Sequence, residues 1–426
     1  MTDLARLRAV LRGEEDAPPA LPRPAPARVD LAAFAARLGA GLETAALGPC
    51  PVVRRWFDGS ERDGPYGDRI GEAARAVSAS GLEVLAGGEA PMWSGGDPAA
   101  GLVFFDLETT GLSGGSGTVA FVVGFGCFEG GRFHVWQHVL PSFAGERRLL
   151  AAVTEAVGRA HTLVTFNGKS FDLPFMEMRW LFHRLETPMP GLRHLDLLHP
   201  ARRLWGPDTG GLGALESRVL GFERPDDVPG HEIPSRYFRY LRTGDPGPLR
   251  GVLLHNQFDL VSLGILTGLA CRLADAGPQA TDAARQCLGL GRVYERAGLG
   301  SRADACYARV AGAPGSDEPG PAPDRDSRAE ALYRLALARR RARRHDEAAV
   351  LWERLLALGR PTGALEREAL RALAIHHEHR LKDDGAALRL ARQAYQGEPT
   401  VHRRRDGEQR MTRLERRLRF PGDPSA

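Results

Sequence analysis

The chain has 426 residues, of which 43% are hydrophobic and 26% are charged, with a formal net charge of +4. That length exceeds what one hydrophobic core organises, so we expect two or three domains of a soluble globular protein. The five cysteines are scattered and never in Cys-x-x-Cys spacing, which favours a reducing compartment over a structural zinc site. No apolar run approaches about 18 residues, so we expect a cytoplasmic protein without a membrane span or signal peptide.

The first hundred residues carry no recognisable chemistry. Residues 1–40 are predicted to hold a short helix at Met1–Arg12 and a Pro/Ala-rich linker at Ala17–Arg28. Residues 41–100 are expected to form a lead-in segment that packs on the next domain.

Strands alternate with helices from Gly101 to about residue 275, which predicts an α/β layer fold. The expected strands cover residues 102–105, 119–128, 132–140 and 162–166, and the expected helices cover residues 146–160 and 172–185. The loop around Gly114 and Gly117 lacks both Gly-x-Gly-x-x-Gly and Gly-Lys-Ser/Thr, so neither a Rossmann nor a P-loop nucleotide site is expected.

The first of these strands ends in two acids. Side chains alternate along a strand, so Asp106 and Glu108 share one face. Two like charges about 4 Å apart repel by about 4 kcal/mol at an effective dielectric near 20. A bound metal ion would compensate that repulsion; the alternative is a pair of solvated acids at a strand end.

Two further constellations contain acids. Asp172 lies where the strand ending at Phe166 gives way to a helix, and it is either a site acid or a residue that caps that helix. His255 and Asp259 are spaced to share one helical face near the expected start of an apolar helix. The alternative for this pair is a helix-start acid beside an unrelated histidine.

Taken in order, the segments FDLETTG, FNGKSFDLPF and HNQFDL resemble the three motifs of the ribonuclease-H-like 3′–5′ exonucleases. That superfamily uses four acidic metal ligands, the DEDD set. The resemblance implies two Mg²⁺ or Mn²⁺ ions and a histidine, His255, that activates water. The implied metal ligands are Asp106, Glu108, Asp172 and Asp259.

One position departs from the family pattern. The histidine branch places its histidine five residues before the last aspartate, where this chain has Leu254. The tyrosine branch uses the position four residues before, which His255 occupies here. The spacing therefore matches one branch and the chemistry matches the other.

Residues near these motifs are candidates for substrate contacts. Those predicted to bind substrate are Thr109, Asn167, Lys169 and Arg179. Asp196 is either a fifth acid of the site or a supporting residue. Tyr237 and Tyr240, in a loop-rich insertion at Pro207–Leu249, would either stack on bases or pack inside the protein.

The region from residue 276 to 420 reads as helical repeats. Small residues recur at Ala303, Ala348 and Ala386, at spacings longer than the tetratricopeptide period of about 34 residues. The alternative is a generic helical bundle. Val401–Phe420 carries 8 Arg against 3 acids and is either a nucleic-acid-binding tail or a solvated helix.

The chain more narrowly resembles the YprB-type bacterial proteins, in which a ribonuclease-H-like domain precedes tetratricopeptide repeats. The resemblance covers roughly residues 40–400 and includes GLSGGSGTVAFVVGFG, which starts at Gly111. It implies an α/β ribonuclease-H-like domain at 101–275 followed by an all-α repeat domain at 276–420. We therefore predict a metal-dependent 3′–5′ exonuclease acting on single-stranded DNA or RNA, with a protein partner on the repeats. The alternatives are a catalytically silent nucleic-acid-binding scaffold and a purely protein-binding adaptor.

Overall fold

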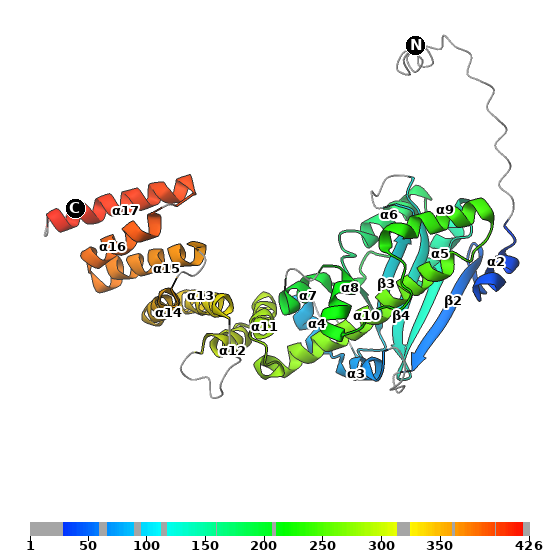
Figure 1. The fold of residues 1–426 in the computed structure, drawn as a ribbon, viewed down its shortest axis with the longest axis horizontal. Helices are drawn as coiled ribbons and strands as arrows, with labels where there is room; N and C mark the ends of the chain where they lie inside the picture. Colours follow the sequence, from blue (N-terminus) through cyan, green and yellow to red (C-terminus); the bar gives the residue numbers. More distant parts are fainter. Residues whose placement is uncertain are drawn as a thin grey trace, which may run out of the picture.

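The computed structural model describes residues 29–58, 66–88, 95–111, 117–158, 160–206, 210–312, 324–359, 363–396 and 398–420. A mixed sheet with flanking helices forms the first part of the protein, and the second part is entirely helical (Figure 1). The predicted fold class is confirmed. The expected helix at Met1–Arg12, the linker at Ala17–Arg28 and Gly114 lie outside the described residues.

One sheet of seven strands organises the first part, in the order β1-β2-β5-β4-β3-β6-β7. The strands are β1 (Gly41–Ala45), β2 (Gly48–Asp58), β3 (Leu102–Thr109), β4 (Ala120–Glu129), β5 (Arg132–Val139), β6 (Thr162–Thr165) and β7 (Arg193–Asp196). The pairs from β1 to β3 are antiparallel, while β3, β6 and β7 run parallel. The segment expected to be a lead-in therefore contributes two strands to the sheet itself, because β2 pairs with β5 along most of its length.

Helices cover both faces of the sheet. On one face, α5 (Glu146–Val157), α6 (Asp172–Phe182) and α9 (Ile233–Thr243) share a core with Phe105. On the other, α3 (Arg69–Ala76), α4 (Ala79–Ala86) and α10 (Leu249–Ala276) share a core with Phe104. These neighbouring phenylalanines are both fully buried on opposite faces, which is the alternation expected of a central strand.

Helix α10 crosses the sheet beside β3, β4 and β5. By length and composition it could cross a membrane, but 78% of its most apolar window is buried inside the protein, as in a core helix. The prediction that this helix starts at His255 was wrong. It starts at Leu249, directly after Pro248, because proline is well tolerated at a helix start and has no N–H to satisfy there.

The second part consists of helix pairs. The helices are α11 (Ala284–Arg296), α12 (Gly300–Ala311), α13 (Arg325–Arg341), α14 (His345–Ala357), α15 (Gly363–His376), α16 (Asp384–Tyr395) and α17 (Val401–Arg419). Each odd-numbered helix from α11 to α15 packs on the next, and α17 packs on α16 (Figure 1). Ala303, Ala348 and Ala386 are buried, as expected for small residues at helix crossings, while the tetratricopeptide assignment stays a prediction.

The two parts share a hydrophobic core. Helix α11 packs against α7 (Leu198–Trp205), and one cluster of buried residues runs from the sheet to Leu373 of α15. A Cβ atom added at Gly289 of α11 would lie 2.0 Å from the carbonyl oxygen of Arg203, so only glycine permits this approach of the two helices.

Candidate active site

Asp106 and Glu108 lie on β3, on the face that α10 covers. The strand ends with the two acids, as predicted: it runs to Thr109, and its ladder with β4 persists until a register shift between Glu108 and Thr109. The two acids share this face, as their spacing predicted, and Leu107 between them packs on the core of the opposite face. Glu108 is buried and Asp106 is half-buried.

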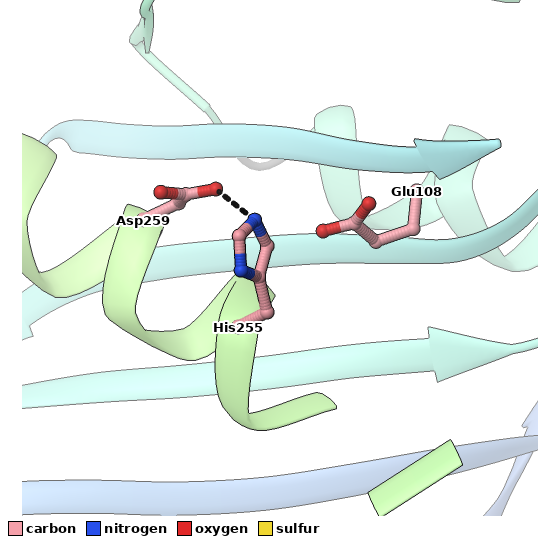
Figure 2. A group of neighbouring side chains, drawn as sticks. All are labelled: Glu108, His255 and Asp259. Atoms are coloured by element: carbon pink, nitrogen blue, oxygen red, sulfur yellow. Dashed lines mark ion pairs between the residues drawn. The ribbon is translucent and has the colours of Figure 1, made fainter. Parts of the chain in front are cut away.

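His255 and Asp259 lie one turn apart on α10 and face Glu108 (Figure 2). One potential ligand atom from each of these three residues lies within 4.8 Å of the others, close enough to share a metal ion. His255 Nε2 is 3.5 Å from Asp259 Oδ2. A strand and a helix that are distant in sequence thus supply one cluster.

Asp106 and Asp172 belong to the same electrostatic cluster. Burial raises the pKa of Asp106 well above its ordinary value, and the charges of Asp259 and Asp172 raise it further. Burial and the charges of Asp106, Asp259 and Asp172 raise the pKa of Glu108 in the same way. Burial, with Asp196 and Asp259, raises the pKa of Asp172 to about 7. All four predicted ligands therefore act on one another across a partly desolvated site.

Asn256 orients Asp106. Its Nδ2 donates to Asp106 Oδ2 at 2.7 Å, and its Oδ1 accepts from Gln137 Nε2 at 2.8 Å. Asn256 and Gln137 are both fully buried. Gly124 of β4 leaves space for the amide, since an added Cβ would lie 2.1 Å from Asn256 Oδ1. The carboxylate of Asp106 is therefore held by a chain of buried hydrogen bonds.

Asp196 supports the segment that leads to Asp172. It is buried, and its Oδ1 accepts the backbone N–H groups of Asn167 at 2.7 Å and Leu198 at 3.1 Å. Its Oδ2 accepts the backbone N–H of Lys169 at 3.1 Å. Asp196 thus fixes the turn between β6 and α6, in which Asn167 adopts a left-handed φ of 71°. Of the two roles considered for Asp196, this is the supporting one.

Arg224 supplies a positive charge beside the acids. Its guanidinium binds Asp259, Glu216 and Asp227, with Nη2 2.7 Å from Glu216 Oε1 and Nη1 3.3 Å from Asp227 Oδ2. Glu216 is almost completely buried, and the Arg224 side chain is only 10% exposed. The described part of the site therefore holds one arginine against more acids than it can neutralise.

Asp227 contacts the histidine on the side away from the acids. Its Oδ1 lies 2.8 Å from His255 Nδ1 and also accepts the backbone N–H of Val228 at 2.8 Å. Sequence reasoning missed Arg224, Asp227 and Asn256. Asn256 sits inside the HNQFDL motif, but no spacing rule connects that motif with the segment around Arg224.

The predicted substrate residues divide into two groups. Thr109 Oγ1 donates to the carbonyl of Gly111 at 2.9 Å, Asn167 is half-buried, and Lys169 is exposed. Arg179 was wrong as a substrate contact, because it is 97% buried and its Nε donates to Glu146 Oε1 at 2.6 Å inside the core. Phe171, 61% exposed directly before Asp172, was overlooked.

The aromatic residues of the insertion do not face a substrate. Tyr237 is fully buried and stacks on Phe121 with ring centroids 4.2 Å apart. Tyr240 is also buried, and its hydroxyl donates to the carbonyl of Pro141 at 2.6 Å. Packing, the second of the two roles predicted for them, is the one that they fulfil. The insertion is not all loop, because it contains α8 (Leu212–Leu215) and α9.

The donor set suits hard divalent cations. Carboxylate oxygens prefer Mg²⁺ or Mn²⁺, and no cysteine belongs to the described site. A pair of such ions would neutralise the charge of the four acids, which Arg224 offsets only in part. Asp106, Glu108, Asp172 and Asp259 are the residues that would hold them.

Residues 103–271 match the sequence model of the RNase H superfamily. Over 165 residues the chain is also 42% identical to the Bacillus subtilis (strain 168) protein YprB, itself described as uncharacterized. That similarity covers 38% of this chain and 40% of YprB, so the match spans well under half of the relative. Residues 103–271, which contain all four acids and His255, therefore form a ribonuclease-H-like domain.

Proposed function

We propose that the protein is a two-metal-ion-dependent nuclease, and more specifically a 3′–5′ exonuclease that hydrolyses phosphodiesters of single-stranded DNA or RNA. The observation that carries this proposal is the convergence of Asp106, Glu108, Asp172 and Asp259 with His255 in one partly desolvated cluster. The 3′–5′ direction rests on the resemblance of the motifs to the DEDD exonucleases.

The arrangement of side chains matches this chemistry. Two divalent ions, when bound, would relieve charge at both the attacking and the leaving oxygen of an in-line displacement. Asn256 keeps Asp106 oriented, and Asp196 keeps the turn before Asp172 in place. His255 presents Nε2 toward Glu108 and Asp259, where it can take a proton from an attacking water.

Two exposed residues that precede Asp172 in the chain support single strands as the substrate class. Lys169 can pair with a phosphate, and the exposed ring of Phe171 can stack on an unpaired base. A stacked base has to be out of a duplex, which favours single strands.

Degradation of end-labelled single-stranded DNA and RNA tests the proposal. With Mn²⁺ or Mg²⁺, we expect 5′-labelled strands to shorten progressively, and chelation to stop the reaction. Asp106→Asn should lose more than the roughly 10–100-fold that removal of a supporting contact costs. Glu177→Gln, which changes an exposed acid of α6, should keep full activity.

A nucleic-acid-binding scaffold would give a different pattern. Wild-type protein and Asp106→Asn would then bind the labelled strands equally, as measured by fluorescence anisotropy, and neither would degrade them with either metal. That result would exclude the nuclease.

A further inference from the structure

We propose that Asp227 is the positioning residue for His255: it holds the imidazole as the Nδ1–H tautomer, so that the lone pair of Nε2 faces Glu108 and Asp259. This inference rests on the proposed function for its catalytic consequence, although the tautomer itself can be measured independently.

The two nitrogens of His255 have unequal partners. Nδ1 lies 2.8 Å from Asp227 Oδ1, whereas Nε2 lies 3.5 Å from Asp259 Oδ2. A neutral imidazole carries one proton, and 2.8 Å is an ordinary N–H···O distance while 3.5 Å is at the outer limit. The proton of the neutral ring therefore belongs on Nδ1, and Nε2 is left as an acceptor.

Asp227 is itself fixed in place. Its Oδ1 accepts the backbone N–H of Val228 at 2.8 Å, and its Oδ2 is 3.3 Å from Arg224 Nη1. Arg224 is anchored on the buried Glu216 and also binds Asp259. The same guanidinium thus ties the carboxylate behind the ring to the carboxylate in front of it, which restricts rotation of His255 from both sides.

The contact with Asp227 is consistent with the placement of His255 four residues, and not five, before Asp259. Four residues before Asp259, the side chain shares the helical face of that aspartate. One residue earlier the face turns by about 100°, and the residue there, Leu254, packs against the hydrophobic core instead. Asp227, in the segment between η2 (Glu216–Leu220) and α9, can therefore contact a histidine at position 255.

Substitution of Asp227 should act through the ring. In Asp227→Asn the carboxylate acceptor of the Nδ1 proton becomes an amide that can turn its NH₂ group to the ring, which favours the Nε2–H tautomer. General base catalysis contributes about 10²–10⁴-fold, so a misoriented base should lower kcat by roughly 10–100-fold with KM nearly unchanged. Asp227→Glu, which restores a carboxylate, should recover part of the loss.

Nitrogen-15 NMR of histidine-labelled full-length protein at alkaline pH tests the tautomer. The chain has 13 histidines, so the His255 signals are assigned by their loss in His255→Gln. We expect the Nδ1–H tautomer in the wild type and in Asp226→Asn, a matched control at the exposed neighbour of Asp227, and the Nε2–H form or a mixture in Asp227→Asn. The kcat of these variants is measured alongside.

The outcomes separate the two proposals. An Nε2–H tautomer in the wild type, or an unchanged tautomer and kcat in Asp227→Asn, would overturn the role of Asp227. A wild type that shows the Nδ1–H tautomer but degrades no strand would leave the Asp227–His255 pair standing as a structural feature and would remove the nuclease and the catalytic role together.

Discussion

At the scale of single residues, the acids of the site are destabilised by one another. Glu108 is only 8% exposed, and burial and then the charges of Asp106, Asp259 and Asp172 raise its pKa. Repulsion among these buried acids lowers the stability of the folded state, and bound cations would relieve that repulsion. The four acids therefore lower the stability of the metal-free protein.

Glu108→Gln should therefore stabilise the metal-free protein. The amide keeps the shape of the side chain and removes one buried charge from the cluster, so we expect the free energy of unfolding in chelator to rise by about 1–2 kcal/mol. Urea unfolding with and without Mn²⁺ measures this, and the stabilisation by Mn²⁺ should shrink in the variant. A Glu108→Gln protein that is less stable in chelator and responds fully to Mn²⁺ would contradict this reasoning.

His138 connects pH with stability on the opposite face of the sheet. Burial and then the charge of Arg54 lower the pKa of this histidine to about 4. Glu43 Oε2 lies 3.9 Å from Nε2 but is bound to Arg54, so it does not offset burial. Because the folded-state pKa lies below the unfolded value of about 6.5, the unfolded chain binds the proton first.

The protein should therefore lose stability as the pH falls from about 6.5 to about 4, by up to roughly 3 kcal/mol from His138 alone. Above about pH 6.5, His138 is neutral in both the folded and the unfolded protein, and this loss of stability is absent. Urea unfolding across this pH range should show a shallower decline in His138→Gln than in the wild type. Parallel pH profiles for both proteins would mean that His138 does not titrate in this way.

At the scale of elements, β4 and α10 approach closely only because residue 124 is glycine. A Cβ atom there would lie 2.1 Å from Asn256 Oδ1. We expect Gly124→Ala to displace Asn256 from Asp106 and to destabilise the fold by about 1–3 kcal/mol. A crystal structure of the variant, with its unfolding free energy, measures both effects; an unmoved Asn256 would show that the strand yields instead.

Local sequence rules predicted the elements that carry local signals. The apolar run before Asp106 predicted a buried central strand, and the i, i+4 spacing predicted that His255 and Asp259 share a face. The same rules failed where tertiary pairing decides, because β1 and β2 join the sheet only through the pairing of β2 with β5. Arg224 and Asp227 are placed by a segment between helices, and neither periodicity nor motif spacing identifies such residues.

At the scale of the whole molecule, the helical array extends from the ribonuclease-H-like domain (Figure 1). The shared core and the close packing of α11 on α7 fix its first helix pair against that domain. We propose that the array, as tetratricopeptide-like repeats, binds a protein partner. A fixed orientation would then place that partner consistently relative to the substrate.

Gly289→Leu should loosen this connection. The carbonyl oxygen of Arg203 occupies the space that any side chain would need, so α11 must move away from α7. We expect hydrogen exchange to accelerate in both helices while the strands around Asp106 keep their protection. Gly300→Ala is the control, because nothing lies within 4 Å of the added Cβ. Gly298 is unsuitable as a control position because its φ of 75° is left-handed. Unchanged exchange in Gly289→Leu would show that α11 is not held against α7.

We propose that the four acids from β3, α6 and α10 hold a pair of divalent ions. A crystal grown with Mn²⁺ and measured at the manganese absorption edge tests it directly. We expect two anomalous peaks about 3.5–4 Å apart, ligated by Asp106, Glu108, Asp172 and Asp259. Peaks elsewhere, or a cluster in which Arg224 still binds Asp259 and no manganese is found, would contradict it.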